Sequence, residues 1–272
     1  MVNTAVSTAV TPEAARGELI RAHAAATQQV GQQREAAPPG AFPAPTDPLG
    51  ISASYFTFRR GLAILGLALP VVLIVGVGLG DIQTSLSAYY HFAAAAPLEA
   101  GAGTMRNVFV GILWAIGTFL YLYKGYSAAE DLALDIAGVA ALGVSLFPMD
   151  WPMVPDTARS LTAVVHYTSA MTFFVLTAYV CVFRAKDTLP ILGDAALERR
   201  FRRIYAGLGG VMVGVPAIVL LMHFASNRAA KSYAVLVLEV VGVVVFSVYW
   251  LVKSREVSLI EQGETRQGQT KT

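Results

Sequence analysis

Six long apolar segments separate the polar parts of this chain, and they constrain its fold more than any other feature. A helix that crosses a bilayer needs about 20 mainly apolar residues, because the hydrocarbon core is about 30 Å thick and each residue rises about 1.5 Å. This pattern predicts an all-α, polytopic transmembrane bundle of six helices. The expected helices are Gly61–Gly80, Arg106–Tyr123, Asp131–Phe147, Ser160–Phe183, Ile204–Phe224 and Ser232–Val252.

The composition agrees with a chain that is largely covered by lipid. Hydrophobic residues make up 55% of it and charged residues only 14%, whereas a soluble domain carries about a quarter charged residues. The single cysteine, Cys181, lies in an apolar run, which excludes a disulfide framework and a cysteine-based metal site. No basic-then-apolar stretch with a small-residue cleavage site opens the chain, so we expect the first apolar segment to direct insertion.

The segments outside the bundle have their own composition. Residues 1–50 are rich in Ala, Gln, Pro and Thr, and Thr11-Pro12-Glu13 is typical of a helix start. We therefore expect residues 1–50 to form a disordered cytoplasmic tail with one short helix, 51–254 the transmembrane domain, and 255–272 a second disordered cytoplasmic tail. Within the domain, Ser127 and Glu130 have capping-box spacing and predict the start of the third spanning helix.

The distribution of Lys and Arg predicts the orientation of the bundle. With the amino terminus inside, the inner segments hold 16 of the 20 Lys and Arg residues. Because positively charged loops stay in the cytoplasm during insertion, we expect both termini to lie inside, in a bacterial inner membrane. The run Glu198–Arg203 then faces the cytoplasm, where it suits anionic lipid and not nucleic acid.

This topology places an unusual set of polar residues in the outer half of the bundle. Glu239 lies within an apolar segment, and a charge at the bilayer centre costs at least about 2.5–3.5 kcal/mol. It should therefore point into the bundle, either protonated or paired with Arg106 or a histidine. A packing role competes with roles as a metal ligand, a general base or a proton-carrying carboxyl. The candidate pocket residues are His91, His166, His223, Glu239, Arg106, Ser87 and Asp150.

The three outer histidines raise the question of a metal. Three imidazoles, or two with a carboxylate, form a zinc site with an open position that activates water. His91, His166 and His223 could supply this set with Glu239 or Asp150, although no ligand-spacing motif unites them. Two alternatives stay open: His166 and His223 holding a b-type haem, and histidines that only hydrogen-bond a neighbour.

The loop sequence SLSAYYHF, residues 85–92, has two interpretations. Aromatic rings with a polar tip suit the headgroup level, so Tyr89 and Tyr90 could anchor the loop there. Alternatively, the loop is a re-entrant segment that lines a pocket with Ser87 or His91.

Two resemblances concern the same region. The block from SLSAYYH through the third predicted helix resembles small bacterial membrane proteins of no known function, which implies a family but no activity. The Ser87-Ala-Tyr-Tyr-His91 element is also similar to the Ser-x-x-x-His element of the alkaline-ceramidase and progestin-receptor-like membrane hydrolases, which implies a zinc-dependent activity. No His-x-x-x-His follows, since the residue four after His223 is Asn227.

These features leave open whether the protein is an enzyme. The leading hypothesis is a multi-pass membrane protein that binds a lipid or small apolar ligand in an outward-facing polar pocket. The alternatives are a metal-dependent membrane hydrolase with zinc on His91, His166 and His223, and a small transporter that uses Glu239 as an intramembrane carboxyl. Membrane lipid is the expected partner, and a protein partner or a homo-oligomer is compatible with the sequence.

Overall fold

Within the residues that the computed structural model describes, 51–92, 103–152, 158–225 and 233–269, the chain is helical and contains no strand. The all-α prediction is therefore confirmed for this part of the chain. Residues 1–50, where a tail was predicted, lie outside the described residues. The six α-helices are α2 (Ile51–Val77), α3 (Thr104–Leu122), α4 (Ala128–Leu146), α5 (Leu161–Tyr179), α6 (Ala195–Ala225) and α7 (Ala234–Gln269).

Five of these helices are long and apolar enough to cross a membrane, namely all except α4. Helix α4 differs because its amino-terminal half carries Glu130, Asp131 and Asp135. The predicted capping box at its start is half confirmed, since the Ser127 hydroxyl accepts the N–H of Glu130 at 3.3 Å. Short helical turns connect the long helices: η1 (Leu79–Asp81), η2 (Ser87–His91), the π-helical turn η3 (Val180–Arg184) and η4 (Leu189–Leu192).

Two helices extend further than hydropathy predicts. Helix α2 begins at Ile51 rather than Gly61, and α7 continues to Gln269, so residues 255–269 extend a helix where a disordered tail was expected. Both extensions carry charged residues that are buried: Arg59 is 4% exposed and Glu256 is 0% exposed. Because these side chains find polar partners within the bundle, the helices remain packed beyond their apolar stretches.

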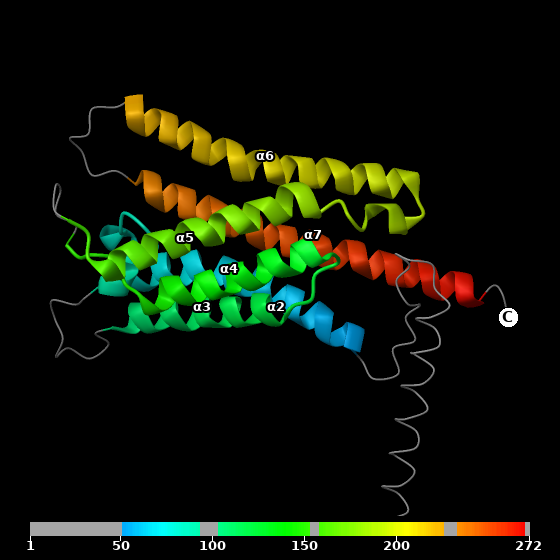
Figure 1. The fold of residues 1–272 in the computed structure, drawn as a ribbon, viewed down its shortest axis with the longest axis horizontal. Helices are drawn as coiled ribbons and strands as arrows, with labels where there is room; N and C mark the ends of the chain where they lie inside the picture. The colour runs from blue at the N-terminus through cyan, green and yellow to red at the C-terminus, as the bar shows by residue number, and fades with distance from the viewer. Residues whose placement is uncertain (1–50, 93–102, 153–157, 226–232, 270–272) are drawn as a thin grey trace, which may run out of the picture. The chain divides into compact units, whose positions relative to one another are not determined.

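The helices follow one another around the bundle in an order that differs from the sequence. Helix α3 packs between α2 and α4, α4 packs against α5, and α7 packs against α2, while α6 lies at the edge next to α7 (Figure 1). Helices α3 and α4 touch through their backbones, because a Cβ atom on Gly138 would lie 2.6 Å from the carbonyl oxygen of Gly117. Small residues at such crossings allow close packing in membranes.

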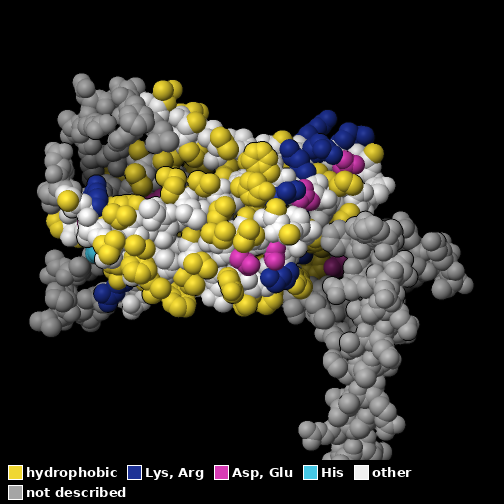
Figure 2. Space-filling view, viewed as in Figure 1, with side chains coloured by type: hydrophobic (Ala, Val, Ile, Leu, Met, Phe, Trp, Pro, Cys, Tyr) yellow, Lys and Arg dark blue, Asp and Glu magenta, His cyan; other side chains and the backbone are white. Residues whose placement is uncertain are grey.

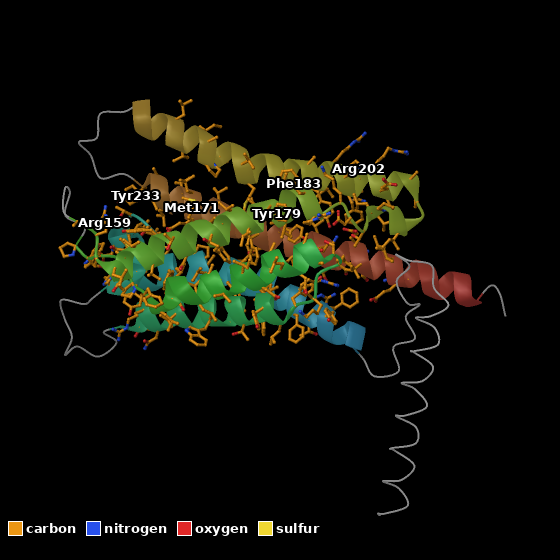
Figure 3. All side chains as sticks on the ribbon, viewed as in Figure 1. Arg159, Met171, Tyr179, Phe183, Arg202 and Tyr233 are labelled. Atoms are coloured by element: carbon orange, nitrogen blue, oxygen red, sulfur yellow. The ribbon has the colours of Figure 1, made fainter. Side chains whose placement is uncertain are left out.

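The two ends of the bundle carry different polar groups. We call the end with His91, His166 and Arg159 the histidine end, and the end where α6 starts, with Arg199 to Arg203, the arginine end. Figure 3 shows Arg159 and Tyr233 at the first end and Arg202 at the other. Figure 2 shows hydrophobic side chains along the face between the two ends, with Lys and Arg gathered near the start of α6.

Candidate functional site

Glu239 lies near the start of α7 and fastens the connection between α2 and α3 onto that helix. Its Oε2 accepts the backbone N–H of Leu86 at 2.5 Å, and its Oε1 accepts the hydroxyl of Ser87 at 3.4 Å. A backbone hydrogen bond from Leu236 to the carbonyl of Thr84, at 3.0 Å, holds the same two segments together. Glu239 was expected to be protonated or paired with Arg106 or a histidine. Its hydrogen bonds in the structure come from a backbone amide and a serine rather than from Arg106 or a histidine, and its protonation stays a prediction.

A small cavity lies beside this carboxyl group. Its volume is about 40 Å³, which is room for about three water molecules, since each needs about 10–15 Å³ of such space. Glu239 and Ser87 are the polar groups on its wall, and the other lining residues are apolar. Five helices contribute to that wall, through Leu69 of α2, Phe109 of α3, Ala141 of α4, Phe173 of α5 and Val243 of α7.

The 85–92 loop is docked into the bundle as the re-entrant interpretation predicts. Its η2 turn buries Ser87 and Tyr89, and Tyr89 is 0% exposed. A headgroup anchor would leave the Tyr89 ring accessible, so that interpretation does not fit this residue. Tyr90 is half-buried beside the exposed Arg106, whose guanidinium carbon lies 6.0 Å from the Tyr90 ring centroid.

His91 and His166 both bind the connection between α4 and α5. His91 Nε2 lies 2.9 Å from the carbonyl oxygen of Met149, and His166 Nδ1 lies 2.7 Å from that of Phe147. Since a carbonyl only accepts, each of these ring nitrogens carries the hydrogen, and the other nitrogen of each ring keeps its lone pair. Partial burial lowers the pKa of His91, which favours the neutral ring.

Asp150 belongs to the same connection but makes local contacts. It accepts the hydroxyl of Ser160 at 2.6 Å, just before α5 begins. This hydrogen bond lowers the pKa of Asp150 and so favours its ionised form. Asp150 therefore serves to close the turn into α5, and it is not brought to Glu239 by any contact in the described residues.

In the described part of the chain, no further side chain joins the histidines as a zinc ligand. Across that part, no three His, Cys, Asp or Glu side chains are placed to hold a metal ion. A histidine that donates one N–H to a carbonyl is a common metal ligand through its other nitrogen, so His91 and His166 are chemically suited to the task. The side chain of His223 lies outside the described residues, so zinc on three histidines and haem on His166 and His223 remain predictions.

A second polar cluster, which the sequence did not reveal, lies at the arginine end. Glu256 of α7 accepts hydrogen bonds from Thr188 and from Tyr205 of α6. Lys253 donates to Thr188 at 2.5 Å and to the carbonyl of Ala185 at 3.2 Å, and it lies 3.5 Å from Glu256. Lys253 and Glu256 are 1% and 0% exposed, so this is a buried ion pair.

The same cluster continues to α2 and to the connection between α3 and α4. Arg59 donates to the hydroxyl of Tyr123 at 3.2 Å and to that of Tyr126 at 2.5 Å. The Tyr126 ring links both halves, because Lys253 Nζ lies 5.1 Å and Arg59 Cζ 5.6 Å from its centroid. Glu130 joins through Oε2, which accepts the backbone N–H of Tyr126 at 2.9 Å.

The sequence carried one usable signal for this cluster. Lys253 and Glu256 are spaced i, i+3, which puts them on one face of a helix. Their partners come from 51 to 68 residues away in the chain, so no local pattern identifies the contacts. No protein-family model, curated protein or solved structure matches the chain, so both family resemblances stay predictions.

Proposed function

We propose that this protein moves protons, alone or together with a small solute, across a bacterial inner membrane, with Glu239 as the proton-binding carboxyl. The observation that carries the proposal is the position of Glu239 on the wall of a small cavity that residues of five helices line. Ionisable residues inside membrane helices are rare and mark ion or substrate pathways. Proton transfer needs a titratable group and a hydrogen-bonding solvent, and water that enters this cavity would meet the carboxyl of Glu239.

The topology in this proposal is six crossings with both termini in the cytoplasm. Helix α4 crosses with the five more apolar helices because its neighbours α3 and α5 cover it on two sides. Lys and Arg support the orientation: the run Arg199 to Arg203 at the start of α6 marks the arginine end as cytoplasmic. The histidine end and the Glu239 cavity then lie toward the outside.

The hydrogen bonds of Glu239 suggest how proton binding is coupled to movement. An ionised carboxylate accepts from both Leu86 N–H and the Ser87 hydroxyl, whereas a protonated carboxyl loses part of that accepting capacity. Proton uptake therefore loosens the 85–92 loop from α7, and proton release docks it again. The charge of Glu239 acts on Tyr167 of the neighbouring helix α5, and the helices around the cavity bring apolar side chains to it.

The size of the cavity favours a proton or water over a lipid ligand. Pockets for drug-sized ligands occupy about 300–1,000 Å³, and this cavity has about 40 Å³. A lipid chain would require the helices to separate, while a proton requires only water. We therefore rank proton transfer above the lipid-binding hypothesis that the sequence favoured.

The experiment that tests this function measures proton flux in vesicles. The purified full chain is reconstituted into phosphatidylcholine and phosphatidylglycerol vesicles that contain a pH-sensitive dye, and an outward or inward pH gradient is imposed. We expect flux above that of empty vesicles, a loss of at least about tenfold in Glu239→Gln, and no change in Asp81→Asn, which removes an exposed acid near the same end. Flux in Glu239→Gln equal to wild type, or wild-type flux equal to that of empty vesicles, would overturn the proposal.

A further inference from the structure

Helix α6 is the least covered of the apolar helices. A smaller share of it is buried than of the other four helices that are long enough to cross a membrane. Its buried residues recur every three or four positions and so form one stripe: Phe201, Tyr205, Gly209 and Met212. Helix α6 packs mainly against α7 and the η3 and η4 turns, and the residues on the side opposite the stripe are exposed.

This exposed face begins at the arginine end with three cations. Arg199 and Arg203 are spaced i, i+4, and Arg200 is spaced i, i+3 from Arg203, so the three side chains are neighbours. All three are exposed, and none of them makes an ion pair within the part of the chain that the structure describes. Arg202 differs, because it lies to the side of this face and pairs with Glu198. The face therefore carries three positive charges without a counter-charge.

Beyond the arginines the same face is apolar and open. Gly207, Gly210 and Gly214 follow Arg203 at spacings of three or four residues, and a Cβ atom on any of the three would meet nothing within 4 Å. Figure 2 shows the cations at the start of α6 beside the hydrophobic surface of the bundle. From Arg203 to Gly214 the helix rises about 16 Å, roughly half of a hydrocarbon core of about 30 Å. The face thus suits a ligand with an anionic head and an apolar tail of about one leaflet in length.

The charge of this face disfavours a second copy of the chain as its occupant. Two copies in one membrane have the same orientation, so a symmetric contact through α6 would be parallel. The three arginines of each copy would then meet at the same end, and like charges at neighbouring positions destabilise a contact. An anionic partner removes this repulsion, because guanidinium groups form paired, charge-assisted hydrogen bonds with phosphate.

We propose that the exposed face of α6 binds one anionic phospholipid, whose phosphate contacts Arg199, Arg200 and Arg203 and whose acyl chain lies along the glycines beyond them. The sequence predicts contact between anionic lipid and the whole charged run, whereas the structure selects three of its four arginines and one helical face. A lipid bound there covers a helix that has few protein neighbours. The inference is independent of proton transport and of which side of the membrane the arginine end faces.

Native mass spectrometry of the full chain in detergent micelles tests the proposal, because it counts bound lipids and copies of the chain together. Phosphatidylglycerol and phosphatidylcholine with identical acyl chains are titrated separately. We expect the first phosphatidylglycerol to bind at least about tenfold more tightly than phosphatidylcholine, and Arg199→Gln, Arg200→Gln or Arg203→Gln each to weaken it about fivefold. The control is Glu198→Gln with Arg202→Gln, which removes an ion pair from the same turns without changing the net charge and should bind like wild type.

Three results would overturn the inference. The first is equal affinity for the two lipids, and the second is an affinity for phosphatidylglycerol that changes no more in the three arginine variants than in the control. If one arginine variant fails to fold, the other two decide. The third is a two-copy mass that disappears in Gly210→Leu but persists in Gly111→Leu, because a second chain would then cover this face. Gly111 of α3 is the matched position, since a Cβ atom there would also meet nothing within 4 Å.

Discussion

Replacing Glu256 by glutamine should strongly destabilise this protein. The substitution keeps the size of the side chain but leaves the ammonium of Lys253 buried without its counter-charge. It also places an amide where the hydroxyls of Thr188 and Tyr205 both donate, so at least one donor loses a good acceptor. Removing one partner of a buried ion pair costs about 3–5 kcal/mol, and neither residue is exposed enough for solvent to reduce that cost.

Thermal unfolding of the purified protein in detergent measures this effect. A loss of about 3–5 kcal/mol corresponds to a decrease in Tm of about 6–20 °C for a chain of this size. Glu198→Gln is the matched control, because Glu198 pairs with Arg202 at the same end of the bundle but on its surface. That pair should contribute at most about 1 kcal/mol.

A double variant separates the charge pair from the packing. Lys253→Met with Glu256→Gln removes both charges, and we expect it to unfold at a higher temperature than Glu256→Gln alone, because no buried charge then lacks a partner. If Glu256→Gln costs less than about 1 kcal/mol, or if the double variant is the less stable, the buried pair does not hold this end together and the reasoning is refuted.

Two further predictions concern single positions. In the same assay, Gly138→Ala should lower the free energy of unfolding by about 1–3 kcal/mol, since its Cβ would meet the backbone of Gly117. Gly111→Ala is the control and should be neutral or stabilising, because nothing lies within 4 Å of a Cβ at that position. Equal effects of the two substitutions would contradict the close contact. The lowered pKa of His91 means that the unfolded state binds a proton more readily, so stability should fall as pH decreases through the ordinary value of 6.5. His91→Gln keeps a donor for the carbonyl of Met149 and should flatten the dependence of Tm on pH between about pH 5 and 7. If the slope of Tm against pH stays unchanged in this variant, His91 is not the source of the pH dependence.

The apolar parts of the fold could be predicted from the sequence because bilayer thickness sets the length of a spanning helix. The same criterion misplaced two helix ends, at Gly61 and Val252, since charged residues lower the local hydropathy. Those errors left Arg59 and Lys253 just outside the predicted spanning helices, and they left Glu256 in the predicted cytoplasmic tail. Their partners are distant in sequence, so only the folded structure identifies them as buried.

At the histidine end the sequence allowed a sharper prediction, because insertion cost restricts where an acid can point. That argument predicted that Glu239 points inward, and the loop pattern offered Ser87 as a pocket residue; the structure places both on the wall of one small cavity, and their role stays a prediction. The argument could not identify the backbone N–H of Leu86 as the principal donor, because every residue except proline carries one. Sequence patterns therefore indicate which side chains need a partner more readily than which groups provide it.

Helix α7 brings these observations together through its length. Glu239 and Glu256 are separated by a rise of about 26 Å, close to the thickness of a hydrocarbon core of about 30 Å. Each acid therefore lies toward one end of the bundle, where a segment that connects two long helices reaches it: Leu86 and Ser87 at the histidine end, and Thr188 at the arginine end. A charge in the middle of α7 would have no such segment within reach, which is a physical reason for the apolar residues between Glu239 and Lys253.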